Sequence, residues 1–306
     1  MEKGLGLPAH PAAQDELEPA AGGKKDLAWV QQAIAAQVHK EWREDFGVDD
    51  YALAVRIAES HIDLGDPAWR FDWLSSRAPG ATRFLDLASG YGTAVFHGLA
   101  KGLEGFGVEP APQKHALAAP LLRGLRLPEQ WRKRNLRAMG ENLPFRGGSF
   151  DAILSYQTLE HVSDPEAVLK EWVRVTSPGG GIHLRCPDYA GTYEGHYRLP
   201  WLPLLPRSLA RLWLRLNRRP PTGLAGIGYV TAGRVERMVD RIQAGQPGLS
   251  LSVTDLEKDR VYRALRRRRW PAPPGWYAAY RLWHALKTCF RREKEIHFWI
   301  GVESKP

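Results

Sequence analysis

The sequence has only two cysteines, Cys186 and Cys289, among 306 residues. Two cysteines cannot form a cysteine-rich zinc cluster or a disulfide framework, so we predict no metal site and a reducing, cytoplasmic location. No stretch approaches the roughly 18 consecutive apolar residues of a membrane-spanning helix. The beginning also lacks the basic-then-apolar order of a secretion signal, and we expect residues 1–25 to be a disordered leader.

Acidic residues are scarce in the C-terminal third. Residues 205–293 contain 19 Lys and Arg against 6 Asp and Glu, an excess of 13 positive charges in a chain whose net charge is +9. The rest of the chain therefore carries a net charge of −4. Any anionic partner, such as a membrane surface, is expected to meet this third.

Strand and helix patterns alternate along the chain. Helical spacing covers residues 26–46 and 51–61, and helices also follow the strands. Seven strands are predicted, at residues 83–87, 102–110, 134–139, 150–156, 182–187, 251–257 and 295–304. This order predicts an α/β fold: a Rossmann-like, seven-stranded, mostly parallel sheet with helices on both faces, helical insertions and an antiparallel last strand. The last two strands are expected to close the sheet with an antiparallel edge.

The expected domains follow this order. After the leader come N-terminal helices or a lid (residues 26–80) and a cofactor-binding core (residues 81–190). A helical insertion with the acceptor pocket follows (residues 191–248). The last two strands, with a basic aromatic insertion between them, complete the chain (residues 249–306).

The stretch FLDLASGYG, residues 84–92, ends a buried strand in small residues directly before a helix. Such a turn lets a ligand approach the backbone and the free N–H groups of the helix. The dinucleotide motif G-x-G-x-x-G is missing, because Val95 stands at its third glycine position. Asp86 on the first strand and Glu109 after the second remain, and Glu109 could accept hydrogen bonds from both hydroxyls of a ribose. Tight helix–sheet packing is the alternative explanation of the turn.

At this point the sequence resembles the class I S-adenosylmethionine-dependent methyltransferases. FLDLASGYG is similar to their first motif, with Ala88 where a glycine usually stands, and FGVEPAP is similar to their second-strand motif. The stretch from ENLPFRGGS to IHLRCPD resembles a signature of the small-molecule branch, which includes quinone and sterol enzymes. The resemblance runs from about Thr82 to Asp188 and implies S-adenosylmethionine as cofactor.

The resemblance also implies which residues contact the cofactor. The small-residue turn would lie against its methionine part, Asp86 would hold its amino end, and Glu109 would bind the ribose. Met139 departs from the family, which often has there an acid that accepts from the adenine amino group. The complete expected set is Asp86, Ala88, Ser89, Gly90, Gly92, Glu109, Pro110, Met139, Gly140, Glu141, Tyr156 and Gln157.

Three residues are candidates for catalysis: His161, His196 and Tyr197. His161 follows the fourth strand, near the expected methyl group, and could remove a proton from a hydroxyl acceptor. It could equally cap or pack its loop. His196 and Tyr197 follow the fifth strand, where this fold builds its acceptor pocket.

The stretch EGHYRLPWLPLLPR resembles an insert in methyltransferases of cell-surface polysaccharide gene clusters. We therefore expect transfer of a methyl group to a small-molecule or lipid-linked acceptor, with O-methylation of a sugar or lipid-linked sugar favoured. The alternative is an RNA-directed methyltransferase or a nucleic-acid-binding relative. Nucleic acid is the less expected partner, because no N/D-P-P-Y-type motif follows the fourth strand. A fold that binds cofactor without turnover is a third possibility.

Two segments could meet a membrane. From Ser208 a helical period places a row of large apolar residues opposite a row of arginines, which suits a lid, a helix on anionic lipid, or a helix docked on the sheet. Residues 263–292 combine a basic run with aromatic residues at helical steps. Such a segment could contact a lipid surface, bind nucleic acid, or expose its charges to solvent beside a packed aromatic helix. The oligomeric state is not indicated.

Overall fold

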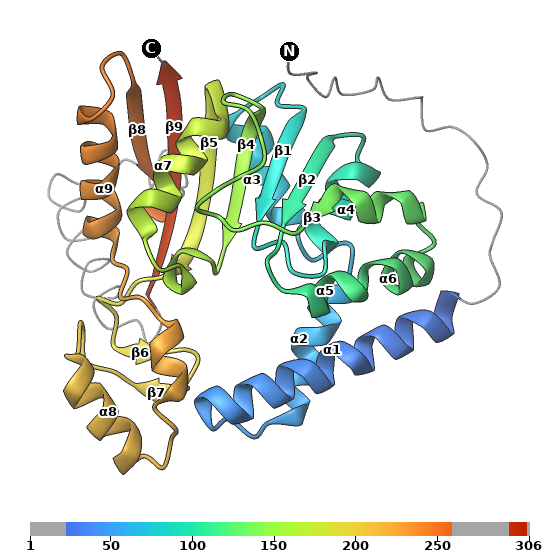
Figure 1. The fold of residues 1–306 in the computed structure, drawn as a ribbon, viewed down its shortest axis with the longest axis vertical. Helices are drawn as coiled ribbons and strands as arrows, with labels where there is room; N and C mark the ends of the chain where they lie inside the picture. The colour runs from blue at the N-terminus through green and yellow to red at the C-terminus, as the bar shows by residue number, and fades with distance from the viewer. Residues whose placement is uncertain (1–22, 259–293, 305–306) are drawn as a thin grey trace, which may run out of the picture.

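A computed structural model describes residues 23–258 and 294–304 of the chain. Seven strands form one twisted sheet in the order β3-β2-β1-β4-β5-β9-β8 (Figure 1). Their bounds are β1 Arg83–Leu87, β2 Glu104–Val108, β3 Asn135–Leu136, β4 Phe150–Tyr156, β5 Thr176–Pro187, β8 Ser250–Asp255 and β9 Glu295–Ser304. The predicted fold class is confirmed.

The antiparallel strand is not at the edge of the sheet. β9 pairs antiparallel with both β5 and β8, whereas the other pairs in the sheet are parallel. β8 and β9 are the last two strands in sequence, and the expectation that together they close the sheet with an antiparallel edge is confirmed, with β8 outermost. The basic segment 263–292 lies outside the described residues, as do residues 1–22 of the expected leader.

Helices cover both faces of the sheet, because successive strand residues point to opposite sides. On one face Leu85 and Leu87 join a core cluster with helices α7 and α9. On the other face Phe84 packs against helices α3 and α4. The helix bounds are α1 Gly23–Phe46, α2 Tyr51–Ile62, α3 Ala68–Arg77, α4 Thr93–Ala100, α5 Pro112–Ala116, α6 Ala118–Leu125, α7 Pro165–Val175, α8 Arg207–Leu216 and α9 Ala232–Ala244.

The end of the sheet at which the parallel strands terminate carries additional elements (Figure 1). Helices α1 and α2 lie beyond β1 and β2, and they pack with α4 and α6 through a cluster around Val30, Ile34 and Leu121. Three short 3-10 helices, at Glu129–Arg134, Leu159–His161 and Thr222–Gly226, complete the connections. Every helix in the described part of the chain is too short or too polar to cross a membrane.

A separate apolar cluster lies at the same end. It joins the small hairpin β6 (Tyr193–Glu194) and β7 (Leu199–Pro200) to α8 and the 3-10 helix 222–226. Tyr197, Trp201 and Leu214 are its buried members. This group of residues, 189–229, is called the hairpin–helix unit below.

Candidate active site

The turn after β1 is held in left-handed backbone conformations. Ala88 has φ 50°, Gly90 has φ 58° and Gly92 has φ 91°. Side chains disfavour this region, and Ala88 accepts it where glycine is more usual. A Cβ at Gly90 would meet nothing within 4 Å, whereas one at Gly92 would lie 2.9 Å from Phe96. The backbone at Gly90 therefore faces open space, and Gly92 begins α4.

Polar contacts with Asn135 hold the turn in place. Ser89 Oγ donates to Asn135 Oδ1 at 2.5 Å, and Asn135 Nδ2 donates to the Gly90 carbonyl at 3.3 Å. Both contacts lie above Gly107 of β2, where a Cβ would come within 2.6 Å of Asn135 Oδ1. Asn135, at the start of β3, is a site residue that sequence reasoning missed, since a lone Asn after a basic stretch gives no distinct signal.

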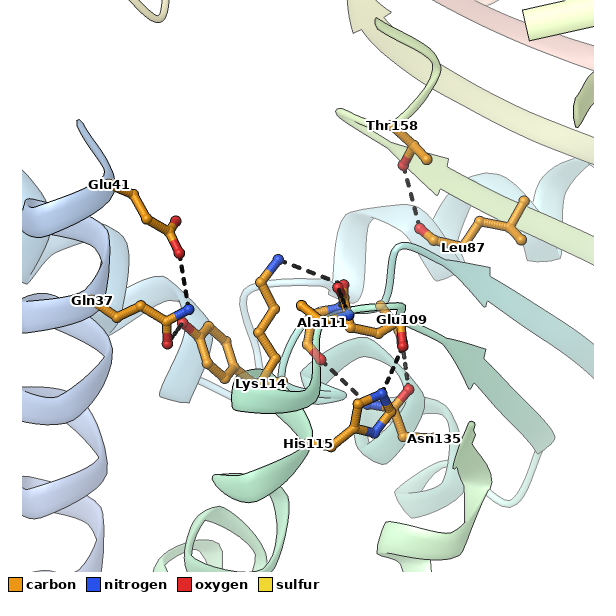
Figure 2. Close-up of polar contacts among 12 residues, drawn as sticks. Gln37, Glu41, Leu87, Glu109, Ala111, Lys114, His115, Asn135 and Thr158 are labelled. Carbon is orange, nitrogen blue, oxygen red and sulfur yellow. Dashed lines mark hydrogen bonds and ion pairs between the residues drawn. The ribbon is translucent and has the colours of Figure 1, made fainter. Parts of the chain in front are cut away.

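Glu109 lies at the end of β2 with its carboxylate against the turn (Figure 2). Its Oε2 accepts from the Gly90 N–H at 3.0 Å and its Oε1 accepts from the Ala111 N–H at 3.0 Å. Lys114 Nζ lies 3.6 Å from Oε2. The side chain is almost fully buried. The sequence analysis did not single out Lys114 either, although its position five residues after Glu109 could have suggested an ion pair.

Asp86, on β1, is buried beside an arginine of α3. Burial raises the pKa of Asp86 to about 6, because desolvation outweighs the attraction of Arg70. Arg70 Nη1 lies 3.6 Å from Asp86 Oδ1, and its guanidinium lies 4.6 Å from the ring centre of Tyr156. Arg70 thus joins the ends of β1 and β4. The helix that carries it was not predicted, although Phe71 and Leu74 bury one face of it.

The other residues predicted to contact the cofactor after β2 and β3 differ in their exposure and contacts. Met139 is 56% exposed. Glu141 accepts from Ser163 Oγ at 3.4 Å, and a Cβ at Gly140 would lie 3.6 Å from Val168. Pro110 is exposed and its carbonyl accepts from Arg137 Nε at 3.3 Å. These residues belong to the loops after β2 and β3.

The end of β4 is tied to the end of β1. Gln157 has φ 53°, and its N–H donates to the Arg185 carbonyl of β5 at 2.8 Å. The next residue, Thr158, donates from Oγ1 to the Leu87 carbonyl at 3.3 Å (Figure 2). The turn that carries Tyr156 and Gln157 therefore lies beside the small-residue turn.

Two of the catalytic candidates meet in the structure. The rings of His161 and His196 lie edge to face with centres 5.1 Å apart. His161 Nδ1 lies 3.0 Å from the Gly226 carbonyl, which can only accept, so Nδ1 carries the proton and Nε2 has the lone pair. His196 Nδ1 lies 2.8 Å from Glu194 Oε1. The third candidate, Tyr197, is fully buried in the hairpin–helix unit.

Glu160, the neighbour of His161 in sequence, completes this cluster. Its side chain is completely buried, and neither carboxylate oxygen has a hydrogen-bond partner among the residues that the structure describes. His161 Nε2 lies 3.9 Å from Glu160 Oε1. Burial raises the pKa of Glu160 to about 7. A buried carboxyl without hydrogen bonds is costly, and such groups concentrate at functional sites.

The pKa values of the two histidines, His161 and His196, are shifted in opposite directions. Desolvation, with His196 nearby, lowers the pKa of His161. For His196, desolvation is outweighed by the hydrogen bond to Glu194, and its pKa is raised. One ligand atom from each of Glu160, His161 and His196 lies within 4.8 Å of the others, so these residues could also approach a divalent cation.

Part of the chain is similar to known methyltransferases. Residues 85–184, about a third of the chain, match the family described as a methyltransferase domain. An uncharacterized methyltransferase of Mycobacterium sp. (strain JLS) is 39% identical over 146 residues, covering 47% of this chain and 52% of the relative. One from Mycobacterium tuberculosis (strain ATCC 25177 / H37Ra) is 34% identical over 126 residues, covering 40% and 47%. The chain thus spans about half the length of these relatives.

Solved structures show weaker likeness. Haemonchus contortus phosphoethanolamine N-methyltransferase 2 has a TM-score of 0.48 at 15% identity, over 94% of this chain and 61% of that one. An S-adenosylmethionine-dependent methyltransferase from Mesorhizobium loti has a TM-score of 0.45 at 16% identity, over 79% and 99%. Similarity at this level carries no inference about the acceptor.

The sheet order, the small-residue turn after β1 and the acid after β2 are the features that the resemblance to class I methyltransferases led us to expect. The family match shows that residues 85–184 are similar to a methyltransferase domain.

Proposed function

We propose that the chain binds S-adenosylmethionine at the turn after β1 and transfers its methyl group to a small-molecule acceptor. One observation carries this proposal. The Glu109 carboxylate is buried against the Gly90 N–H, at a turn whose backbone faces open space. An acid at the end of the second strand is suited to the two hydroxyls of a ribose, and an open turn is suited to a ligand that approaches the backbone.

The residues present fit this cofactor. Glu109 would accept from the ribose hydroxyls, and the turn of Ala88, Ser89, Gly90 and Gly92 would contact the methionine part. Asp86 would face the amino group, and Arg70, 3.6 Å away, would neutralise a carboxylate. Pro110, Met139, Gly140 and Glu141 would line the adenine, with Tyr156 and Gln157 beside the sulfur. When bound, S-adenosylmethionine supplies an activated methyl group.

The acceptor is proposed to be a hydroxyl, favoured on a sugar or lipid-linked sugar, with peripheral contact to an anionic membrane. His161 is proposed as the general base. Its pKa is lowered, so its ring is neutral at pH 7, and its Nδ1 proton is fixed on the Gly226 carbonyl. The lone pair on Nε2 can therefore take the hydroxyl proton. His196, held by Glu194, would position His161 through the ring contact.

Glu109→Ala tests the cofactor site. We expect S-adenosylmethionine affinity to fall about 10- to 150-fold, equivalent to roughly 1.5–3 kcal/mol for hydrogen bonds to a charged group. Isothermal titration calorimetry on folded protein measures this. Glu236→Ala, an exposed acid on α9, is the matched control and should bind as the wild type does. Equal affinity in both variants would refute the assignment of Glu109.

A further inference from the structure

Exposed apolar side chains gather in one short stretch. In the described ranges 23–258 and 294–304, nine large apolar residues are exposed, and six of them lie between residues 202 and 216. These six, called the apolar face below, are Leu202, Leu204, Leu209, Leu212, Trp213 and Leu216. Single exposed apolar residues are normal, but a contiguous group marks an interaction surface.

Helix α8 is attached to the protein by its other side. Ala210 and Leu214 are its fully buried residues and pack in the hairpin–helix unit. Leu209, Leu212 and Leu216 recur at helical steps and are 52%, 53% and 70% exposed. The expectation that this leucine row could dock on the sheet is therefore wrong. The row points away from the body of the molecule, and α8 lies at its outer end (Figure 1).

The charge around the apolar face has one sign. Residues 195–235 contain seven arginines and no Asp or Glu. Four of the arginines are bound within the fold: Arg198 by Asp50, Arg207 by the Leu224 carbonyl, Arg219 by the Gly47 carbonyl and Arg234 by the Tyr229 carbonyl. The side chains of the other three, Arg211, Arg215 and Arg218, are exposed and have no ion-pair or hydrogen-bond partner among the described residues.

We propose that the apolar face docks on an anionic lipid surface, with Arg211, Arg215 and Arg218 against the headgroups. A helix with leucines and a tryptophan on one side and arginines beside them is suited to the boundary between headgroups and acyl chains. Arginine side chains can bury their stems along apolar surface while the guanidinium reaches phosphate. The inference locates the membrane contact proposed above, rests on that part of the proposed function, and does not depend on methyl transfer.

This surface is coupled to the candidate catalytic cluster. The hairpin–helix unit that anchors α8 also carries His196, whose ring contacts His161 and Phe46. The backbone of the same unit donates from Gly228 to the Glu160 carbonyl at 2.5 Å. A lipid-linked acceptor in the docked membrane would thus meet the unit that bears His196.

Vesicle co-sedimentation of the full chain tests the proposal. Vesicles of phosphatidylcholine with about 30% phosphatidylglycerol are compared with pure phosphatidylcholine, at about 0.1 M and 1 M salt, where the Debye length falls from ~10 Å to ~3 Å. We expect binding to the anionic vesicles that weakens in high salt. One variant replaces Leu209, Leu212 and Leu216 by Ser, and a second replaces Arg211, Arg215 and Arg218 by Gln.

Both variants should bind at least tenfold more weakly. The arginine variant loses three charges, each of which contributes about fivefold near an anionic surface. The leucine variant loses the apolar area that would enter the membrane boundary. The matched control removes three exposed positive charges elsewhere, by replacing Arg132, Lys133 and Arg237 with Gln. It should bind nearly as the wild type does. Circular dichroism and S-adenosylmethionine titration on the same samples establish folding and separate a failure of docking from a failure of the cofactor site.

Three results would overturn the proposal. Equal binding by the wild type and the leucine variant would remove the apolar face from the contact. Self-association that the leucine variant abolishes, without vesicle binding, would assign the face to a second copy of the chain. Salt-sensitive binding to single-stranded RNA, without vesicle binding, would assign the arginines to nucleic acid.

Discussion

At the scale of single residues, His161 is the group whose chemistry the fold prepares most completely. A carbonyl fixes its proton on Nδ1, and its lowered pKa keeps the ring neutral. If it is the base, activity should be constant near neutral pH and fall only below about pH 6.5, the ordinary histidine value from which its pKa is lowered. A structural residue would give no such profile.

His161→Gln should lower turnover about 100-fold or more with a hydroxyl acceptor that the wild type methylates, and should leave cofactor affinity intact. Steady-state kinetics across pH, with calorimetry for the cofactor, measure both effects. His39→Gln, on α1, is the control histidine and should retain full turnover. A small loss of turnover in His161→Gln, or a loss of folding, would return this residue to a packing role.

Glu160 should make stability depend on pH. Its pKa is about 7 in the folded state and 4.5 ordinarily, so between these values the folded protein keeps a proton that the unfolded chain has lost. The folded state binds more protons there, and stability falls as pH rises through this window. Above pH 7 the charged carboxylate is buried without a hydrogen bond, and the full penalty applies.

Glu160→Gln removes that charge with little change of shape. We expect the variant to be more stable than the wild type at pH 8, by about 1–3 kcal/mol, and to approach it near pH 4.5. Urea unfolding at both pH values measures the difference. Glu236→Gln, on the surface, should change stability by less than about 0.5 kcal/mol. A destabilised Glu160→Gln at pH 8 would show that the carboxylate charge is compensated.

At the scale of elements, close approach of helix and strand positions the small-residue turn. α4 begins at the turn and packs against β1 through Gly98, where a Cβ would lie 2.3 Å from the Phe84 ring. Alanine usually stabilises a helix relative to glycine by roughly 0.5–1 kcal/mol. Overpacking costs roughly 1–3 kcal/mol and should outweigh this gain.

Gly98→Ala is therefore expected to destabilise the protein by about 1–2 kcal/mol, measured by chemical unfolding. Gly233→Ala is the matched control in α9, because its Cβ would meet only the flexible end of Arg237, at 3.4 Å. It should be neutral or slightly stabilising. Equal effects at both positions would contradict the close packing of α4.

Three site contributions could not be predicted at this scale. Arg70, Asn135 and Glu194 reach the site from α3, β3 and β6, which are far apart in sequence. Arg70 and Asn135 belong to no quoted motif, and the stretch EGHYRLPWLPLLPR, which begins at Glu194, does not indicate which partner this acid meets. Their roles depend on which strand ends meet in the folded chain, and local periodicity carries no such information.

At the scale of the whole molecule, the turn proposed to bind the cofactor and helix α8, which carries most of the apolar face, both lie toward the end of the sheet where the parallel strands terminate (Figure 1). Positive charge gathers in the same part of the chain, since residues 195–235 contain seven arginines and no Asp or Glu. A long-range field from these arginines would orient the docked molecule, with headgroups at α8 and the hairpin–helix unit between the membrane and His161.

The sequence by itself determined the alternation of strands and helices along the chain, the turn at residues 88–92 and the acid at Glu109, because these depend on local patterns: an apolar run, small residues at fixed spacing and an alternating βα order. Only the tertiary structure decided which face of α8 is buried and which group accompanies His161. The leucine row of α8 has the stronger hydrophobic pattern, yet the helix packs through Ala210 and Leu214. Glu160 and His196 come together because separate loops fold to one sheet end, and such long-range contacts leave no local signal.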